Sequence, residues 1–323
     1  MLAAAPDVGP PAAVSQVRVA PGSRGWRRDA GRLSSTWWCA VTHMSRASLR
    51  DRGGPGGDGS ALPHDVRLEE VCGELDRERV RSAWRRPSCG LGAVLGVDAH
   101  GPVSVDLVAD GPHALLAGTT GAGKSELLTS WMLQLAAGHP PHRLSLVLVD
   151  YKGGAAFARL ARLPHTAGVL TDLDHAMTSR ALSCLSAEVR RRERVLAAHG
   201  ASDVQAMREE DRPARLVLVV DEFAVLSTGH PEVLDSLIRV AAQGRSLGIH
   251  LILATQRPQG AVSPAIRANT SLRVCLRVLD AADSRDVLGH DGAARIGHHP
   301  GRVLVSGAGG AQDSAADRQG LGD

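Results

Sequence analysis

The chain has 323 residues, with 37 lysines and arginines against 34 aspartates and glutamates, a formal net charge of +3 and 2% aromatic residues. This small positive charge excludes the dense basic surface of a dedicated nucleic-acid reader, although it does not decide between DNA and protein as the partner. The scarcity of aromatic side chains requires a core of Leu, Val, Ile and Ala, which favours a buried parallel sheet over an aromatic-rich sandwich.

The five cysteines are scattered and form no Cys-x-x-Cys pair or Cys/His spacing typical of a zinc site. This usage indicates a reducing cytoplasm. No run of about 18 uncharged apolar residues occurs, so we expect no transmembrane segment in this chain. The N-terminus lacks the basic start and apolar stretch of a signal peptide.

The composition divides the chain into four parts. Residues 1–60 are rich in Gly, Pro, Ser and Arg without periodicity, which predicts a disordered, low-complexity segment. Its Trp37-Trp38 pair is either a docking point for a partner or a random consequence of an upstream start codon. We expect a linker with a short helix over residues 61–95, the main domain over 96–306 and a flexible tail over 307–323.

Apolar runs alternate with helical patterns through the main domain. Each run is apolar on both faces, which predicts an α/β fold with a mostly parallel central sheet flanked by helices. The predicted strands are Ala114–Ala117, Leu144–Val149, Leu216–Val220, His250–Ala254, Arg273–Val278 and Arg302–Val305. The predicted helices span about 124–137, 174–198 and 231–245.

A glycine-rich phosphate-binding loop follows the first of these strands. Gly118-Thr-Thr-Gly-Ala-Gly-Lys-Ser125 fits the pattern G-x-x-x-x-G-K-[ST] between a strand and a helix. Gly121 and Gly123 allow the backbone to approach phosphate closely, Lys124 reaches the β- and γ-phosphates of ATP, and the Ser125 hydroxyl binds Mg²⁺. The predicted nucleotide-binding residues are Gly118, Thr119, Thr120, Gly121, Ala122, Gly123, Lys124, Ser125 and Glu126.

The use of lysine supports this interpretation. Only Lys124 and Lys152 are lysines, and every other basic residue among the 37 is arginine. A phosphate loop needs a compact ammonium that acts as a point charge, whereas arginine is a broad planar fork. The retained lysine at position 124 therefore indicates a specific requirement.

A pair of carboxylates ends the third predicted strand. Asp221-Glu222 follows the apolar run Leu216–Val220. A carboxylate at the end of a buried strand beside a phosphate loop can hold Mg²⁺, and the next can orient and deprotonate the attacking water. We therefore predict Asp221 as a metal ligand and Glu222 as the catalytic general base, with Lys124 also catalytic.

Two polar residues end the next strand. Thr255 and Gln256 follow the run His250–Ala254. Because ligands bind beyond the carboxyl ends of strands in a doubly wound sheet, either residue could sense the γ-phosphate. The alternative is that they only begin a polar loop.

These motifs resemble the FtsK/SpoIIIE family of motor ATPases. The resemblance rests on the phosphate loop, on Val219–Ala224, on Gly244–Pro258 and on Asp283–Leu288, and it covers about residues 68–305. It implies a RecA-like P-loop NTPase fold. Within the family, Val149–Phe157, Leu163–Thr166, Asp110–His113 and the approach through Leu68–Arg86 are similar to the first motor domain of the EccC/EssC ATPases of type VII secretion.

The resemblance implies a homo-oligomeric ring, hexameric in this family, or an assembly with other motor subunits. ATP would then lie between subunits, and an arginine from the neighbour would stabilise the transferring phosphoryl group. By its place in the pattern Asn269–Arg277, Arg273 is the first candidate and Arg277 the second; either could instead be a surface arginine beginning a strand.

The implied partners are secretion substrates or membrane secretion components, which would hold a cytoplasmic protein at the inner face of the cell membrane. Full-length secretion ATPases carry N-terminal membrane helices and usually several motor domains in tandem, whereas we expect one motor here. The chain would then be a piece of a split system, a soluble paralogue or a truncated gene product.

Three functions stay open at the level of the sequence. The first is an ATP-hydrolysing motor for protein export, which the Asp150-Tyr-Lys-Gly-Gly154 segment favours. The second is a DNA translocase, since the motor motifs are shared and DNA remains a possible partner. The third is a nucleotide-binding regulatory module without turnover.

Overall fold

The computed structural model describes residues 66–86, 88, 90–98, 101–151, 157–171, 175–229 and 231–307. The predictions for residues 1–60 and for the tail after Gly307 lie outside these residues. Lys152 and the rest of its segment up to residue 156 also lie outside them.

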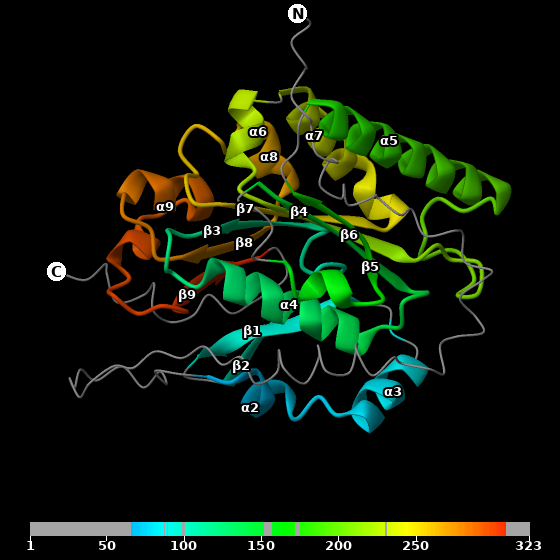
Figure 1. Ribbon diagram of the computed structural model, residues 1–323, viewed down its shortest axis with the longest axis horizontal. Coiled ribbons are helices and arrows are strands. Elements are labelled where there is room, and N and C mark those ends of the chain that lie inside the picture. Colours follow the sequence, from blue (N-terminus) through cyan, green and yellow to red (C-terminus); the bar gives the residue numbers. More distant parts are fainter. Residues whose placement is uncertain are drawn as a thin grey trace, which may run out of the picture.

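Within the described residues, seven strands form one sheet in the order β5-β4-β6-β7-β3-β8-β9 (Figure 1). All neighbouring pairs are parallel except β8 and β9, which are antiparallel. The predicted α/β fold with a mostly parallel sheet is thus confirmed. The strands are β3 His113–Ala117, β4 Leu144–Asp150, β5 Thr166–Thr171, β6 Arg215–Asp221, β7 Ile249–Thr255, β8 Leu272–Leu276 and β9 Val303–Ser306.

The strands of this sheet are apolar on both faces because helices cover both. On β3, Leu116 belongs to the core on the side of α4, whereas Leu115 belongs to the core on the opposite side. Successive side chains of a strand point to opposite faces, so an unbroken apolar run supplies both cores at once. This arrangement explains why the predicted strands read as continuous apolar runs.

Helix α4 lies on one face of the sheet, and α5 to α8 lie on the other (Figure 1). Trp131 and Met132 of α4 are fully buried, since this helix packs between the sheet and further elements outside it. Among the described residues, no helix is both long and apolar enough to cross a bilayer. The helices of these two layers are α4 Lys124–Gly138, α5 His175–Ala198, α6 Ala224–Gly229, α7 Pro231–Leu247, α8 Pro264–Asn269 and α9 Ala281–Leu288, with 3₁₀ turns η2 Leu160–Arg162 and η3 Gly292–Arg295.

A two-stranded hairpin and two short helices cover the outer side of α4 (Figure 1). The hairpin pairs β1 Gly92–Asp98 with β2 Gly101–Asp106 in antiparallel fashion. The side chain of Gln134 on α4 bonds both backbone groups of Val94 at 2.8 Å, which fastens the hairpin to this helix. The helices are α2 Leu68–Cys72 and α3 Arg77–Arg85.

This covering layer corrects the predicted linker. The stretch 61–95 contains two helices rather than one, and Val80 of α3 is buried in the core beside α4. The boundary at residue 96 falls inside β1. The strands of the hairpin were not predicted because they contain glycine. A glycine interrupts the alternation of apolar side chains on which a strand prediction depends.

The other predicted elements agree with the structure within two residues, but the short helices α6, α8 and α9 and the strand β5 were missed. Its sequence Thr-Ala-Gly-Val-Leu-Thr buries only Leu170 fully, since β5 lies at the edge of the sheet. A half-buried edge strand carries too few apolar residues for its pattern to be recognised.

Candidate active site

The predicted site residues, apart from Arg273, gather at the carboxyl ends of the parallel strands. Parallel pairing places Ala117 of β3 beside Thr255 of β7 and Cys275 of β8, and it places Asp221 of β6 beside Ala254. The carboxyl ends of all four strands therefore meet at the edge where ligands bind in open α/β sheets. The phosphate loop begins there, directly after β3.

The phosphate loop takes a conformation that requires glycine at two positions. Gly121 and Gly123 have φ angles of 79° and 101°, in the left-handed region that other residues avoid. A Cβ on Gly123 would also lie 3.1 Å from the backbone nitrogen of Gly301. Gly123 precedes α4 without a side-chain cap, so the first N–H groups of this helix point toward the loop, as in anion-binding helix starts.

Backbone contacts hold this loop from two sides. The N–H and the hydroxyl of Thr119 donate to the carbonyl of Arg277 at 3.0 and 3.1 Å. On the other side, the N–H of Gly301 donates to the carbonyl of Ala122 at 2.9 Å. The segments after β8 and before β9 therefore hold the loop in place, and no pattern in the sequence indicated either contact.

The ammonium of Lys124 contacts the carboxylate of Asp221. Lys124 Nζ donates to Asp221 Oδ1, and each side chain is only 3% exposed. The two residues are 97 positions apart in the sequence and come from α4 and β6. The structure thus brings together the two groups that the sequence predicted to converge on one triphosphate.

Glu222 follows Asp221 with a backbone conformation that is uncommon outside glycine. Its φ angle is 64°, and among the described residues it is the one non-glycine residue with a positive φ. Its carboxylate is buried and accepts from the hydroxyl of Thr255 at 2.8 Å. The backbone N–H of Gln256 lies 3.2 and 3.3 Å from its two oxygens.

Gln256 connects the phosphate loop to this carboxylate. Its side-chain Oε1 accepts from the hydroxyl of Thr120 at 3.0 Å. Thr255 and Gln256 therefore do more than begin a loop, since each contacts a residue of the predicted site. The sequence indicated their position but not the contact of Thr255 with Glu222.

The structure does not bring Arg273 to the phosphate loop. Arg273 is the second residue of β8, and its guanidinium donates to the carbonyls of Thr270 at 3.3 Å and Arg267 at 3.2 Å. Burial, with the charge of Arg267, lowers its pKa below the ordinary value. Arg277 is nearer the loop, and its guanidinium lies 3.5 Å from His298 Nε2.

Asp150 is a residue of this edge that the sequence analysis did not assign. It is the last residue of β4, only 1% exposed, and pairs in register with Asp221 on β6. A carboxylate directly after the apolar run Leu144–Val149 repeats the pattern of Asp221, so the same signal could have found it. The two acids lie side by side at the ends of neighbouring strands.

The available oxygen ligands fit a magnesium ion that is held mainly by phosphate. The hydroxyl of Ser125, in the first turn of α4, and the carboxylate of Asp221 are hard oxygen donors. Among the described residues, no group of three or more His, Cys, Asp or Glu side chains could hold a metal alone. Mg²⁺ in nucleotide sites binds through one or two protein oxygens, water and the phosphates, so the donor set agrees with this ion.

Comparison with known proteins gives independent information. The model of the FtsK/SpoIIIE family matches residues 75–214 and 204–260. The type VII secretion system protein EssC of Staphylococcus aureus is 37% identical over 261 residues, which are 76% of this chain and 18% of the relative. This chain therefore spans about a fifth of the length of that relative.

Two solved structures are also similar. The cytoplasmic domain of the Thermomonospora curvata type VII secretion ATPase EccC has 31% identity and a TM-score of 0.70, covering 75% of this chain and 31% of that one. The pCW3 conjugation coupling protein TcpA, in its monomer form with ATPγS, has 26% identity and a TM-score of 0.60, covering 72% of this chain and 65% of that one.

Proposed function

Since this chain belongs to the FtsK/SpoIIIE family, we propose that it is a magnesium-dependent P-loop ATPase that energises protein export in a type VII secretion-like system. The observation that carries the proposal is the contact between Lys124 and Asp221 at the carboxyl edge of the sheet. A buried ammonium and a buried carboxylate beside a glycine loop are the groups that a triphosphate and its metal require.

The phosphate loop supplies the binding energy for the nucleotide. The N–H groups from Gly118 to Glu126 and the start of α4 surround the phosphates of ATP, and Lys124 binds the β- and γ-phosphates. Thr119, Thr120 and Ala122 contribute backbone and hydroxyl groups to the same loop. This arrangement accounts for the lysine at position 124, because its single ammonium can leave Asp221 and follow a phosphate.

Ser125 and Asp221 would hold Mg²⁺, which when bound neutralises charge on the β- and γ-phosphates. Asp221 then takes part in two alternative contacts, with Lys124 in one state and with the metal in the other. The side chains of Lys124 and Asp221 are each at least nine-tenths buried. Water therefore stabilises neither charge well when its partner is absent.

Glu222 acts as the general base. It takes a proton from the attacking water while the water oxygen bonds to the γ-phosphorus. The bond between that phosphorus and the β–γ bridging oxygen breaks, which releases ADP and phosphate. Gln256, joined to Thr120 of the loop, senses the γ-phosphate.

Two comparisons support protein export as the work that this ATPase performs. Identity is 37% with EssC and 31% with the EccC cytoplasmic domain, both named as components of type VII secretion, against 26% with TcpA. The chain acts in a ring or with other motor subunits, and membrane secretion components hold it at the inner face of the membrane. Arg273 of a neighbouring subunit, with Arg277 as the second candidate, stabilises the transferring phosphoryl group.

Translocation of DNA is the second candidate function. It is supported by the similarity to TcpA, a conjugation coupling protein, which covers 72% of this chain. The net charge of +3 gives it little additional support, because DNA-binding surfaces depend on many phosphate contacts.

One experiment separates these functions. The rate of ATP hydrolysis and the assembly size of the purified chain are measured with a small helical-hairpin secretion substrate, with duplex DNA and with neither. The export function predicts magnesium-dependent turnover that the secretion substrate raises and DNA does not. Stimulation by DNA with a steep salt dependence would instead establish the translocase. Nucleotide binding without turnover in any of the three conditions would instead support a nucleotide-binding regulatory module.

A further inference from the structure

Thr255, the last residue of β7, lies directly against the carboxylate of Glu222. Its hydroxyl donates to Glu222 Oε1 over 2.8 Å, and the N–H of Gln256 lies 3.2 Å from the same oxygen. Thr255 is 0% exposed and Glu222 is 6% exposed, so water cannot readily take the place of these donors. The end of the neighbouring strand therefore fixes the position of this carboxylate.

The hydroxyl of Thr255 has a defined orientation. Its oxygen accepts from the backbone N–H of Arg257 at 3.0 Å. A threonine hydroxyl carries one proton and two lone pairs, so an incoming N–H leaves the proton to point elsewhere. Here the proton points to Glu222. Valine in place of Thr255 would keep the shape of the side chain and remove this donor.

The backbone of Glu222 is shaped for the same contact. The residue takes a left-handed φ of 64°, while the N–H of Phe223 returns to bond the carbonyl of Ala254 on β7 at 2.9 Å. Residues in this region of φ/ψ space persist where the surrounding structure fixes them, and they concentrate at functional sites. The reversal at Glu222 turns its side chain toward the end of β7 and away from the direction of β6.

The residues that hold Glu222 also contact the phosphate loop. The carbonyl of Thr255 accepts from the N–H of Gly118 at 3.3 Å, and the side chain of Gln256 accepts from the hydroxyl of Thr120 at 3.0 Å. The loop, Gln256 and the Glu222 carboxylate thus form one continuous series of hydrogen bonds. If a bound triphosphate displaces Thr120, Gln256 would transmit this displacement to Glu222, because Gln256 bonds both residues.

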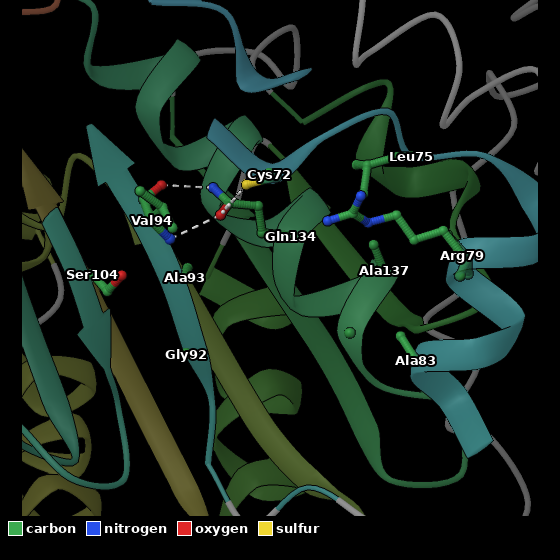
Figure 2. Close-up of a pocket in the computed structure, with 12 residues that line it drawn as sticks. Cys72, Leu75, Arg79, Ala83, Gly92, Ala93, Val94, Ser104, Gln134 and Ala137 are labelled. Atoms are coloured by element: carbon green, nitrogen blue, oxygen red, sulfur yellow. Dashed lines mark hydrogen bonds between the residues drawn. The ribbon is translucent and has the colours of Figure 1, made fainter. Parts of the chain in front are cut away.

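A pocket lies away from this site. It has a volume of about 300 Å³ and lies between α2, α3, the β1–β2 hairpin and α4, where Cys72 bonds Gln134 at 3.1 Å (Figure 2). The amide of Gln134 is already bonded to Val94, as the dashed lines of Figure 2 show. None of the other described residues that line this pocket identifies an occupant.

We propose that Thr255 is a positioning residue for Glu222, and that the contact of Gln256 with Thr120 makes this position respond to the nucleotide. The inference depends on the proposed ATPase function. A general base must lie within hydrogen-bond reach of the proton that it removes, and a hydroxyl that is itself held in place keeps the carboxylate in one orientation. Thr255 therefore orients the base.

The test compares Thr255→Val with Thr255→Ser, which restores the hydroxyl, and with Thr166→Val as a matched control. Thr166 lies on β5, where its hydroxyl donates to the carbonyl of Leu160 at 2.7 Å, far from the site in the sheet order. The measurements are the affinity for an ATP analogue and the single-turnover rate of hydrolysis.

We expect Thr255→Val to bind the analogue normally and to hydrolyse ATP about tenfold to a hundredfold more slowly. Thr255→Ser should recover most of the rate, and Thr166→Val should match the parent chain. A rate within twofold in Thr255→Val, or a Thr255→Ser variant equally slow, overturns the proposal.

A second measurement does not need turnover. Thr255→Val, Glu222→Met and the double variant are compared by their urea unfolding midpoints. If the hydroxyl binds the carboxylate, the two changes should be non-additive, whereas additive midpoint shifts overturn the contact itself. If the parent chain fails to hydrolyse ATP, the proposed function fails, and this cycle still decides whether Thr255 positions Glu222.

Discussion

The Lys124 ammonium lies against the Asp221 carboxylate in the interior of the site, with both side chains 3% exposed. Removing one member of a buried ion pair leaves the other charge without water or partner. We therefore expect Lys124→Met to lower the free energy of unfolding by about 3 kcal/mol. Lys124→Met combined with Asp221→Asn should cost less, because no uncompensated charge remains. Urea unfolding of the two variants measures the difference, and equal losses would contradict the argument.

Glu222→Gln should separate nucleotide binding from hydrolysis. The amide keeps the size of the side chain but cannot accept a proton from water, so we expect the rate to fall by about a hundredfold or more. Affinity for ATP should stay within a few-fold, since the phosphate loop is unchanged. Glu210→Gln is the matched control, because Glu210 pairs with Arg208 at an exposed position. Equal activity of the two variants would remove Glu222 from the proposed mechanism.

Arg192 and Arg191 provide a matched pair for stability. Arg192 is buried on α5 and donates to the carbonyls of Leu247 at 2.8 Å, Gly248 at 3.1 Å and Ala214 at 2.6 Å. Its neighbour Arg191 is 49% exposed and donates to both carboxylate oxygens of Glu188 at 2.7 Å.

We expect Arg192→Met to lower the free energy of unfolding by about 3 to 5 kcal/mol, because it leaves several buried carbonyls unsatisfied. Arg191→Met should change it by less than about 0.5 kcal/mol, as for other exposed ion pairs. Urea unfolding of both variants compares them directly. Similar losses would mean that the carbonyl contacts of Arg192 contribute nothing specific.

Three buried histidines predict a loss of stability in mild acid. Burial lowers the pKa of His113 and of His165 from 6.5 to about 4, and that of His250 to about 3. Above pH 6.5 these side chains are neutral in both the folded and the unfolded chain. Below it the unfolded chain binds protons that the folded chain does not, so the free energy of unfolding falls by about 1.4 kcal/mol per pH unit for each histidine.

Urea midpoints between pH 7.5 and 5 test this dependence in a range where carboxylates stay largely ionised. His113→Asn is the informative variant, since an amide oxygen can still accept from the Leu251 N–H, which lies 3.0 Å from His113 Nδ1. Below pH 6.5, the free energy of unfolding of this variant should fall with decreasing pH about one third less steeply than that of the parent chain. An unchanged slope would show that His113 titrates alike in both states.

The sequence predicted what local chemistry encodes and missed what depends on tertiary contacts. The loop from Gly118 to Ser125 was recognisable because its glycines and lysine serve one purpose at fixed spacing. Asp221 followed from the buried strand before it. The contacts of Arg277 and Gly301 with this loop involve backbone atoms, which any residue possesses, so no pattern could reveal them.

The role of Thr255 shows the same limit. Its position at the end of an apolar run was visible, but its partner Glu222 is 33 residues away in the sequence. The left-handed backbone conformation of Glu222 could not be predicted either, because glutamate rarely adopts it. The hairpin over α4 was missed for a different reason. Its strands contain glycine where a core-facing side chain would otherwise mark the period.

Arg273 should act on the nucleotide of a neighbouring subunit rather than on its own. Its guanidinium donates to the carbonyls of Arg267 and Thr270 at the end of α8. On β8, Arg273 lies two residues before Cys275, which pairs with Ala117 at the end of β3. We expect Arg273→Ala to bind ATP normally and to lose hydrolysis by at least about a hundredfold, as for arginines supplied in trans. The matched control is Arg285→Ala, an exposed arginine on α9.

Mixing two inactive variants tests whether the arginine acts across the interface. Arg273→Ala retains Glu222, and Glu222→Gln retains Arg273, so a mixed assembly contains some interfaces with both groups intact. If the arginine acts between subunits, the mixture should regain part of the activity that each variant lacks alone. If Arg273 acts within its own chain, such an interface restores nothing, because every chain then lacks one of the two groups. Activity of the mixture measured against each variant at the same total concentration decides between these arrangements.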